Sequence, residues 1–360
     1  MQLVSYIAPA APATRRPARG DEPFLRPEVG FAPAWYRKAL GIDFSRRWHA
    51  DAAHRRETVP VMRGELRRRF GGTAVGGIDR PDEPPDLLTG AYGACFVAGL
   101  HGVPIVYAPD RWPDCEHAYL ADGQAERLRP PDLDRSALLA ELMRQVDWVT
   151  ARHGRAEGFV NWQGVLNNAY RLRGEALFAD MLQCPDRARR VLECVCTTMI
   201  DAARRLHARQ GETGVAVGFF TVSNCLVNMV SPGLYAEMLL PFDVRIAEAF
   251  GCLGIHNCAW RADPYLDHYA RVPHVGYIDM GLDSDLARAR ALFPRARRAV
   301  MYTPMDLAGK APGALRADFE RIAELCGPCD VVLADVGPDT PDRRVLDAVE
   351  LCRRISARYA

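Results

Sequence analysis

Short apolar segments alternate with longer segments of helical periodicity along most of this chain, and this alternation limits the folds that it can adopt. Each short segment suits a buried strand, and the longer ones repeat apolar residues at helical spacing. Repeated strand–helix–strand units imply parallel strands with right-handed crossovers. We expect the strands at Val103–Ala108, Gly158–Trp162, Val215–Thr221, Gly251–Asn257, Val275–Met280, Ala299–Thr303 and Val331–Asp335.

The pattern predicts an α/β fold, and specifically a (β/α)8 barrel with its eighth strand around residues 94–98. An open, doubly wound sheet is the alternative, but no Gly-x-Gly-x-x-Gly turn follows any expected strand, which argues against a dinucleotide-binding version. Residues 1–22 are rich in Pro, Ala and Arg and are expected to form a disordered tail. We expect residues 23–85 to form a helical extension and residues 86–360 to form the barrel.

Composition excludes several classes of partner. The net charge is +1, so nothing global indicates binding to nucleic acid or to an anionic membrane. No apolar segment approaches the roughly 20 residues of a membrane span. The 11 cysteines, an odd number, are scattered through the chain, and no signal peptide is recognisable. These features predict a cytoplasmic protein with reduced thiols and no disulfide framework.

Two candidate metal ligands follow one expected strand. Side chains alternate along a strand, so His256 and Cys258 should point to the same face. An imidazole and a thiolate are both good ligands for zinc. Two ligands do not complete a site, and a purely structural role for the pair is the alternative.

Polar and aromatic residues gather where the other expected strands end. In a barrel, catalytic groups lie at these carboxyl ends. Each residue alone could be a helix cap or part of the core, but together they predict the mouth of a pocket. The strand-end candidates for substrate binding are Trp112, Asn161, Trp162, Asn224, Trp260 and Tyr302, and the further polar candidates are Asp110, Cys225, Asp279 and Asp335. Trp48 and Tyr277 are two further aromatic residues that could form part of the pocket wall.

The order of strand, His-x-Cys, helix, strand, helix and an Asp-x-x-x-x-Thr-Pro turn resembles the uroporphyrinogen decarboxylase-like superfamily. This superfamily includes the decarboxylase of haem synthesis and zinc-dependent methyltransferases that serve corrinoid proteins. The resemblance extends from about Phe31 to the C-terminus and implies a (β/α)8 barrel. Further matching segments are Gly164 to Val191, Val230-Ser231-Pro232 with Leu240-Pro241-Phe242, and Gly337-Pro338-Asp339-Thr340-Pro341.

The resemblance to the methyltransferases implies zinc bound by His256, Cys258 and a third group. In those enzymes the third ligand is a cysteine in a Gly-Cys-Gly turn after the last strand, where this chain has Asp335. Asp335 or Cys225 would therefore complete the site, and Asp279 would orient His256 or act as a base. The implied reaction is methyl or alkyl transfer on a small thiol or a corrinoid-linked substrate. No Asp-x-His-x-x-Gly motif is present, so any corrinoid would come on a separate protein.

Two other functions fit the sequence. The first is a metal-free decarboxylase or lyase, with Arg37 holding a carboxylate and Asp110 or Asp279 transferring a proton. Only Arg37 matches the family's Arg-rich N-terminal motif, and the family's C-terminal His is missing. The second is a non-catalytic protein whose pocket binds a tetrapyrrole or corrinoid. Cys326-Gly-Pro-Cys329 has the thioredoxin spelling, but it follows a helix, where Gly-Pro is an ordinary stop.

Overall fold

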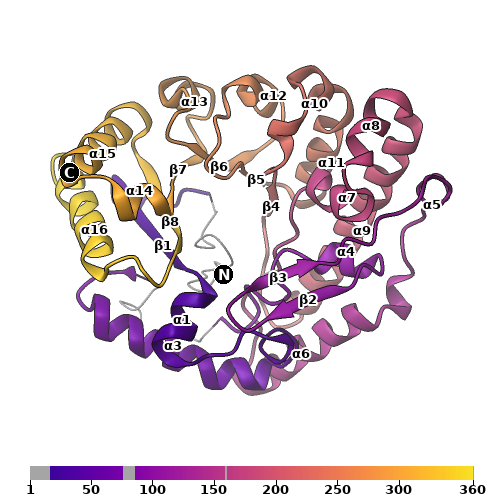
Figure 1. Ribbon diagram of the computed structural model, residues 1–360, viewed down its shortest axis with the longest axis horizontal. Coiled ribbons are helices and arrows are strands. Elements are labelled where there is room, and N and C mark those ends of the chain that lie inside the picture. The colour runs from indigo at the N-terminus through magenta and orange to yellow at the C-terminus, as the bar shows by residue number, and fades with distance from the viewer. Residues whose placement is uncertain (1–16, 76–85, 159, 360) are drawn as a thin grey trace.

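The computed structural model describes residues 17–75, 86–158 and 160–359, and six parallel strands form its central sheet in the order β1-β8-β7-β6-β5-β4. The sheet curves into an arc, and the helices lie around its outside, as expected for an α/β barrel (Figure 1). The predicted α/β barrel is thus confirmed. The strands are β1 (Leu25–Phe31), β4 (Phe220–Ser223), β5 (Leu253–His256), β6 (Val275–Gly281), β7 (Arg297–Tyr302) and β8 (Cys329–Val336).

Helices follow the strands along the chain. Several of them, such as α11 and α15, have a proline in the first turn, where a backbone N–H would have no hydrogen-bond partner within the helix and its absence therefore costs nothing. The helices after β4 to β8 are α10 (Pro232–Met238), α11 (Leu240–Phe250), α12 (Leu266–Tyr269), α13 (Leu286–Leu292), α14 (Pro304–Gly309), α15 (Pro312–Cys326) and α16 (Asp342–Ser356). Those before β4 are α1 (Pro33–Leu40), α2 (Arg46–Ala50), α3 (Ala52–Phe70), α4 (Phe96–Leu100), α5 (Asp122–Glu126), α6 (Ala137–His153), α7 (Val165–Arg173), α8 (Ala176–Gln183) and α9 (Pro185–Gly211).

The first half of the barrel differs from the expected strand positions. Residues 94–98 do not form a strand, because Cys95 caps the short helix α4. The segment expected at 103–108 is β2 (Ile105–Ala108), which pairs antiparallel with β3 (Arg111–Cys115) in a separate hairpin. Within the described part of 158–162, no residue is assigned to a strand. Strand β1 was not expected: it lies within residues 23–85, which were expected to be helical, and it pairs with β8.

Two segments without regular secondary structure, one around Leu88 and one just before α7, take the chain positions of the remaining barrel strands. A Cβ placed on Gly158 would lie 3.0 Å from the Leu88 side chain, so residues 86–88 and 158 are adjacent. A Cβ on Gly164 would lie 2.4 Å from the Ser223 carbonyl oxygen at the end of β4. The backbone in these places packs too closely for any larger side chain. These contacts bring the segment before α7 against the end of β4, where the candidate site lies.

The two faces of the sheet have different roles. On one face, alternate strand residues such as Ile278, Val300 and Leu333 join the large core formed with the helices. On the other face, a small separate apolar cluster fills the space between the strands: Tyr277, Ala299, Met301, Val332 and Ala334. Strand alternation explains this division. The inner face therefore carries a thin apolar layer with polar groups at both of its ends.

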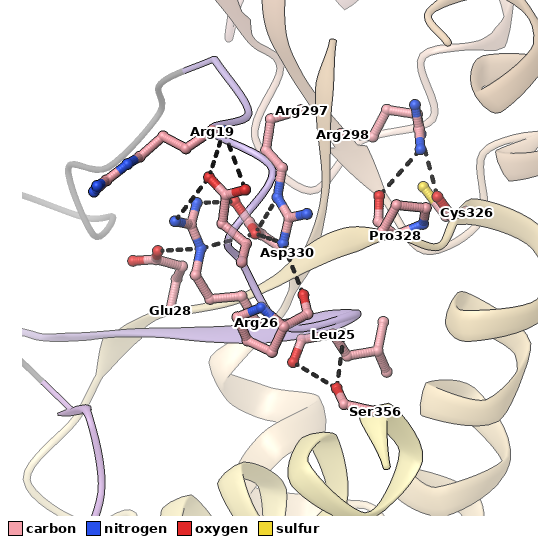
Figure 2. A network of polar contacts seen from close by, with 12 residues as sticks. Arg19, Leu25, Arg26, Glu28, Arg297, Arg298, Cys326, Pro328, Asp330 and Ser356 are labelled. Atoms are coloured by element: carbon pink, nitrogen blue, oxygen red, sulfur yellow. Dashed lines mark hydrogen bonds and ion pairs between the residues drawn. The ribbon is translucent and has the colours of Figure 1, made fainter. Parts of the chain in front are cut away.

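Buried charges occupy the end where the strands begin (Figure 2). Arg26 of β1 lies in register with Asp330 of β8, and its Nε and Nη2 donate to the two carboxylate oxygens at 3.0 and 2.7 Å. Arg297 of β7 donates to Asp330 from the other side at 2.7 Å. These polar residues explain why β1 was missed, because Arg26 and Glu28 break the apolar pattern of a buried strand.

Residues near this end bear on two further expectations, the N-terminal tail and the Cys326–Cys329 motif. The tail predicted at 1–22 lies mostly outside the described residues, but Glu22 accepts hydrogen bonds from the backbone of Arg19 and pairs with Arg26 at 3.8 Å. Cys326 and Cys329 are both buried where α15 gives way to β8, and Arg298 donates to the carbonyl of Cys326 at 3.2 Å. Among the described helices, none combines the length and apolar character needed to cross a membrane.

Candidate metal centre

The carboxyl ends of β4 and β5 bring three potential metal ligands together. The two strands are parallel, with Ser223 paired to His256, and the backbone N–H of Asn224 donates to the His256 carbonyl at 2.6 Å. Cys225 and Cys258 each lie two residues beyond that pair. This register places the two cysteines side by side above the imidazole.

The ligand atoms of Cys225, His256 and Cys258 all lie within 4.8 Å of one another. The Cys258 Sγ is 2.9 Å from the Cys225 Sγ and 3.2 Å from the His256 Nε2. Cys258 has a φ of 57°, in the left-handed region that residues other than glycine rarely adopt. Such backbone conformations concentrate at functional sites. Here the unusual turn occurs at a residue that contributes its thiol to the cluster.

Asp279 of β6 fixes the orientation of the imidazole. Its Oδ2 lies 2.6 Å from the His256 Nδ1 and accepts the Tyr277 hydroxyl at 3.1 Å, while its Oδ1 accepts the backbone N–H of Asn257 at 2.7 Å. Asp279 is fully buried and His256 is 4% exposed. A proton on Nδ1, held by the carboxylate, leaves the Nε2 lone pair directed at the two sulfurs. Metal-binding histidines are commonly held in this way.

A second buried carboxylate supports the Cys225 side of the cluster. Asp243 of α11 accepts hydrogen bonds from the Asn224 side-chain amide at 3.0 Å and from the Tyr235 hydroxyl at 2.6 Å. Burial raises the pKa of Asp243 to about 6, although these two hydrogen bonds oppose the shift. Asn224 directly precedes Cys225, so its hydrogen bond to Asp243 anchors the chain next to Cys225 to a buried group. The predicted role of Asn224 in substrate binding remains a prediction, since the structure shows an anchoring contact.

The turn after Cys225 is anchored from α7. The backbone N–H of Leu226 donates to the Asn167 side chain at 3.1 Å, and the Asn167 amide donates to the Gln163 Oε1 at 2.9 Å. The Gln163 amide in turn donates to the Asn161 Oδ1 at 3.1 Å. Asn161 therefore belongs to a chain of side chains that reaches the cluster.

A cavity of about 350 Å³ opens beside the cluster. Cys225 forms part of its wall, so a molecule in the cavity can reach a cluster thiol. The other walls come from α7 and from the end of β3 and the chain that follows it, and they include Cys115, Tyr119, Asn167, Tyr170 and Arg171. This volume falls at the small end of the range for small-molecule sites.

The donor set fits zinc. Two thiolates and one imidazole are three of the four ligands of a tetrahedral site, and the fourth position would remain for water or substrate. Soft sulfur ligands also favour zinc over magnesium or calcium. Within the described ranges, one group of at least three His, Cys, Asp or Glu side chains has all its ligand atoms within 4.8 Å of one another. This group consists of Cys225, His256 and Cys258.

Asp335 lies outside this group, so the geometry selects Cys225 from the two predicted third ligands. In β8, Val332 and Ala334 face the inner cluster, whereas Asp335 has the opposite parity and its side chain is exposed. Its φ of 52° marks the point where the strand ends. The one-residue offset therefore directs Asp335 away from the inner face of the sheet.

The residues predicted for decarboxylation are not brought together. Arg37 is exposed on α1 and Asp110 is exposed in the β2–β3 turn. Among the described residues, no hydrogen bond or ion pair connects either of them to Asp279. Arg37 instead lies near Asp43, where it adds to the effect of a hydrogen bond from the Ser45 backbone in lowering the pKa of that carboxylate.

Most of the predicted aromatic wall belongs to the core. Trp48 and Trp162 are buried, and Trp48 packs against Phe44 and Trp112 with ring centroids at 4.8 and 6.0 Å. Tyr302 donates to Asp318 at 2.7 Å, away from the cluster. Tyr277 contacts the site through Asp279, and Trp260 follows Cys258 by two residues and packs against Tyr265.

Comparison with known proteins supports the fold. No protein-family model matches the chain, and no curated protein sequence does. Among solved structures, a methyltransferase from Methanosarcina mazei is similar with a TM-score of 0.64 and 14% sequence identity. The match covers 100% of this chain and 95% of that chain. The two proteins share a fold over their whole lengths.

Sequence reasoning missed the residues of α7 and of the segment after β3. Asn167 and Arg171 lie one turn apart on a short helix that follows an expected strand, which was a usable signal. Cys115 and Tyr119 had no such signal, because the β2–β3 hairpin that positions them was expected to be part of the barrel.

Proposed function

We propose that the protein is a zinc-dependent methyl or alkyl transferase that acts on a small thiol or on a corrinoid-linked group carried by a separate protein. The observation that carries the proposal is the cluster of Cys225, His256 and Cys258 at the carboxyl end of the barrel, with a cavity that opens at Cys225. The similar fold of a protein named as a methyltransferase supports the same class of reaction.

The chain's own residues prepare this chemistry in three ways. Asp279 holds the His256 tautomer whose Nε2 faces the sulfurs, and its negative charge balances positive charge at the cluster. Asn224 and Asn167 fix the turn that carries Cys225. When bound, zinc supplies a Lewis acid that lowers the pKa of a substrate thiol and so provides a thiolate at neutral pH. The cavity volume of about 350 Å³ lies at the small end of the range for small-molecule sites, which favours a small substrate.

The first test is the zinc content of the protein purified without added metal, measured by inductively coupled plasma mass spectrometry. We expect about one zinc ion per chain in the wild type, and a loss of most of it in Cys225→Ser and in the double variant His256→Ala with Cys258→Ala. Cys184→Ser is the matched control, because Cys184 is an exposed thiol between α8 and α9. This control should retain full zinc content.

Two results would overturn the proposal. One is a wild type that stays free of zinc even after reconstitution. The other is a Cys225→Ser variant with undiminished zinc, together with loss of zinc in Asp335→Asn, which would move the third ligand to β8. A transferase assay with methylated thiols or a methylated corrinoid then tests the reaction on the zinc-loaded protein.

A further inference from the structure

Arg171 is a half-buried cation in the wall of the cavity that reaches Cys225. Its Nε is buried and has no hydrogen-bond partner within the described residues. Its Nη1 makes one long contact, 3.5 Å, with the carbonyl of Asn167 one turn earlier in α7. Its guanidinium forms no ion pair with a carboxylate of the described residues. Buried cationic groups in proteins are usually paired, so this arrangement calls for an explanation.

The next arginine along the same helix shows the usual arrangement. Arg173, the last residue of α7, donates to Asp180 at 2.8 Å and to the Leu120 carbonyl at 2.5 Å, and it also pairs with Asp122. Arg171 and Arg173 are therefore close in sequence but differ in their partners. Arg173 is satisfied by the protein, whereas Arg171 keeps donors available toward a cavity.

The surroundings of Arg171 leave its charge unneutralised. The Cys115 thiol is one ionisable neighbour: its pKa is lowered chiefly by a hydrogen bond from Cys95 and further by the positive charge of Arg171 and a hydrogen bond from it. This contact leaves the buried Nε without a partner among the described residues. Two carboxylates, Asp114 and Glu116, also line the cavity, but both are exposed to solvent. The Asp114 Oδ1 already accepts the backbone N–H of Cys115 at 2.8 Å. Solvent screens these rim charges far more than it screens the buried Nε of Arg171.

We propose that Arg171 binds a carboxylate at one end of the substrate, while the sulfur at the other end of the substrate reaches the cluster beside Cys225. This inference rests on the proposed function. The substrate class is then a small thiol or thioether that carries a carboxylate. A guanidinium matches a carboxylate with two parallel hydrogen bonds, which a neutral amide cannot reproduce. Arg171 therefore determines specificity, and the cluster activates the sulfur.

The test compares two probes that differ in charge alone, 3-sulfanylpropanoate and 3-sulfanylpropanamide. Their dissociation constants for the zinc-loaded protein are measured by isothermal titration calorimetry, and the readout is the ratio of the two constants. We expect the wild type to bind the carboxylate roughly tenfold or more tightly than the amide, as a charge-assisted hydrogen bond provides. Arg171→Gln should bring the ratio close to one. Arg111→Gln is the control, because Arg111 is exposed on β3 and outside the cavity wall, and it should keep the wild-type ratio.

The outcomes separate this inference from the proposed function. If neither thiol binds the zinc-loaded wild type, the proposed function fails as well. If both bind with equal affinity, or if Arg171→Gln keeps the wild-type ratio, the zinc site stands and the role of Arg171 is refuted. If Arg171→Gln binds neither probe, Arg171→Lys decides: a retained preference for the carboxylate supports the inference, and a complete loss of binding overturns it.

Discussion

Asp279 and Asp330 are both fully buried on the inner face of the same sheet, yet they serve opposite ends of it in different ways. Asp330, near the start of β8, is bound by the two guanidinium groups of Arg26 and Arg297. Asp279, toward the end of β6, receives hydrogen bonds from a backbone amide and a tyrosine hydroxyl and contacts the imidazole of His256. The apolar layer around Met301 separates the two groups.

The difference in partners distinguishes an end of the barrel whose buried charges are neutralised within the protein from the end where the proposed site lies. Two fixed positive charges neutralise Asp330, so this cluster needs nothing more from outside (Figure 2). The donors of Asp279 carry no fixed charge, so its negative charge can offset that of a cation on His256. This division agrees with the general rule for barrels, in which the carboxyl ends of the strands carry the site.

The largest expected effect is on stability, from Asp330→Asn. The amide cannot neutralise the two arginines. Arg26 keeps its ion pair with Glu28 at 2.9 Å, but the buried Arg297 loses its ion-pair partner. Breaking a buried ion pair in this way costs about 3–5 kcal/mol. Urea unfolding monitored by circular dichroism measures the change. The zinc content of the folded fraction should stay at the wild-type level, because the cluster lies at the other end.

Asp339→Asn provides the control for this change. Asp339 also forms an ion pair, with Lys38 at 2.8 Å, but the side chains are 91% and 63% exposed. An exposed pair of this kind contributes at most about 1 kcal/mol. Equal destabilisation by the two variants would contradict the distinction between the buried cluster and the surface, and loss of zinc in Asp330→Asn would contradict the division between the two ends.

The second expected effect concerns pH, through Asp243 beside Asn224. Burial raises the pKa of Asp243 to about 6, so ionisation is less favourable in the folded state than in the unfolded chain. The protein therefore loses stability from this group as pH rises from about 4 through 6, by about 3 kcal/mol at 1.36 kcal/mol per pKa unit. In Asp243→Asn this loss is absent.

The measurement is the free energy of unfolding of Asp243→Asn minus that of the wild type, taken from pH 4 to pH 7. The difference should rise with pH, while the same difference for Asp201→Asn, an exposed aspartate on α9, should stay flat. A flat difference for Asp243→Asn would show that this carboxylate ionises as easily in the folded protein as in the unfolded chain. Because Asn224 binds Asp243, the same variant also reports how strongly this anchor holds the Cys225 turn.

The sequence could predict those parts of the site that depend on a single strand. The period of two along one strand was sufficient to place His256 and Cys258 on one face. The position of Asp279 at the end of the next strand was sufficient to suggest its contact with His256. The strands β5 to β8 were also recognisable, because they are buried and apolar over most of their lengths.

The rest depends on pairing between strands, which no local pattern specifies. Cys225 joins the cluster because Ser223 pairs with His256, and a shift of one residue would turn it away. Asp335 was also a candidate for the third metal ligand because it lies near the end of β8, but it has the opposite parity to Val332 and Ala334, which face the inner cluster. Arg26 and Glu28 concealed β1, because Arg26 is neutralised by Asp330, 304 residues away in the chain, and Glu28 pairs with Arg26.

The smallest expected change in free energy, but the one most specific to the site, comes from Asp279→Asn. The amide keeps the volume of the side chain but cannot accept all the hydrogen bonds that Asp279 accepts, and it no longer fixes the His256 tautomer. Loss of such a supporting carboxylate typically lowers metal affinity 10–100-fold, or by about 1.4–2.7 kcal/mol. Zinc affinity is measured by competition with a chromophoric chelator. Asp283→Asn, at an exposed aspartate shortly after β6, should leave the affinity unchanged. Unchanged zinc affinity in Asp279→Asn, with destabilisation as large as that in Asp330→Asn, would make both carboxylates structural and remove the distinction between the two ends of the barrel.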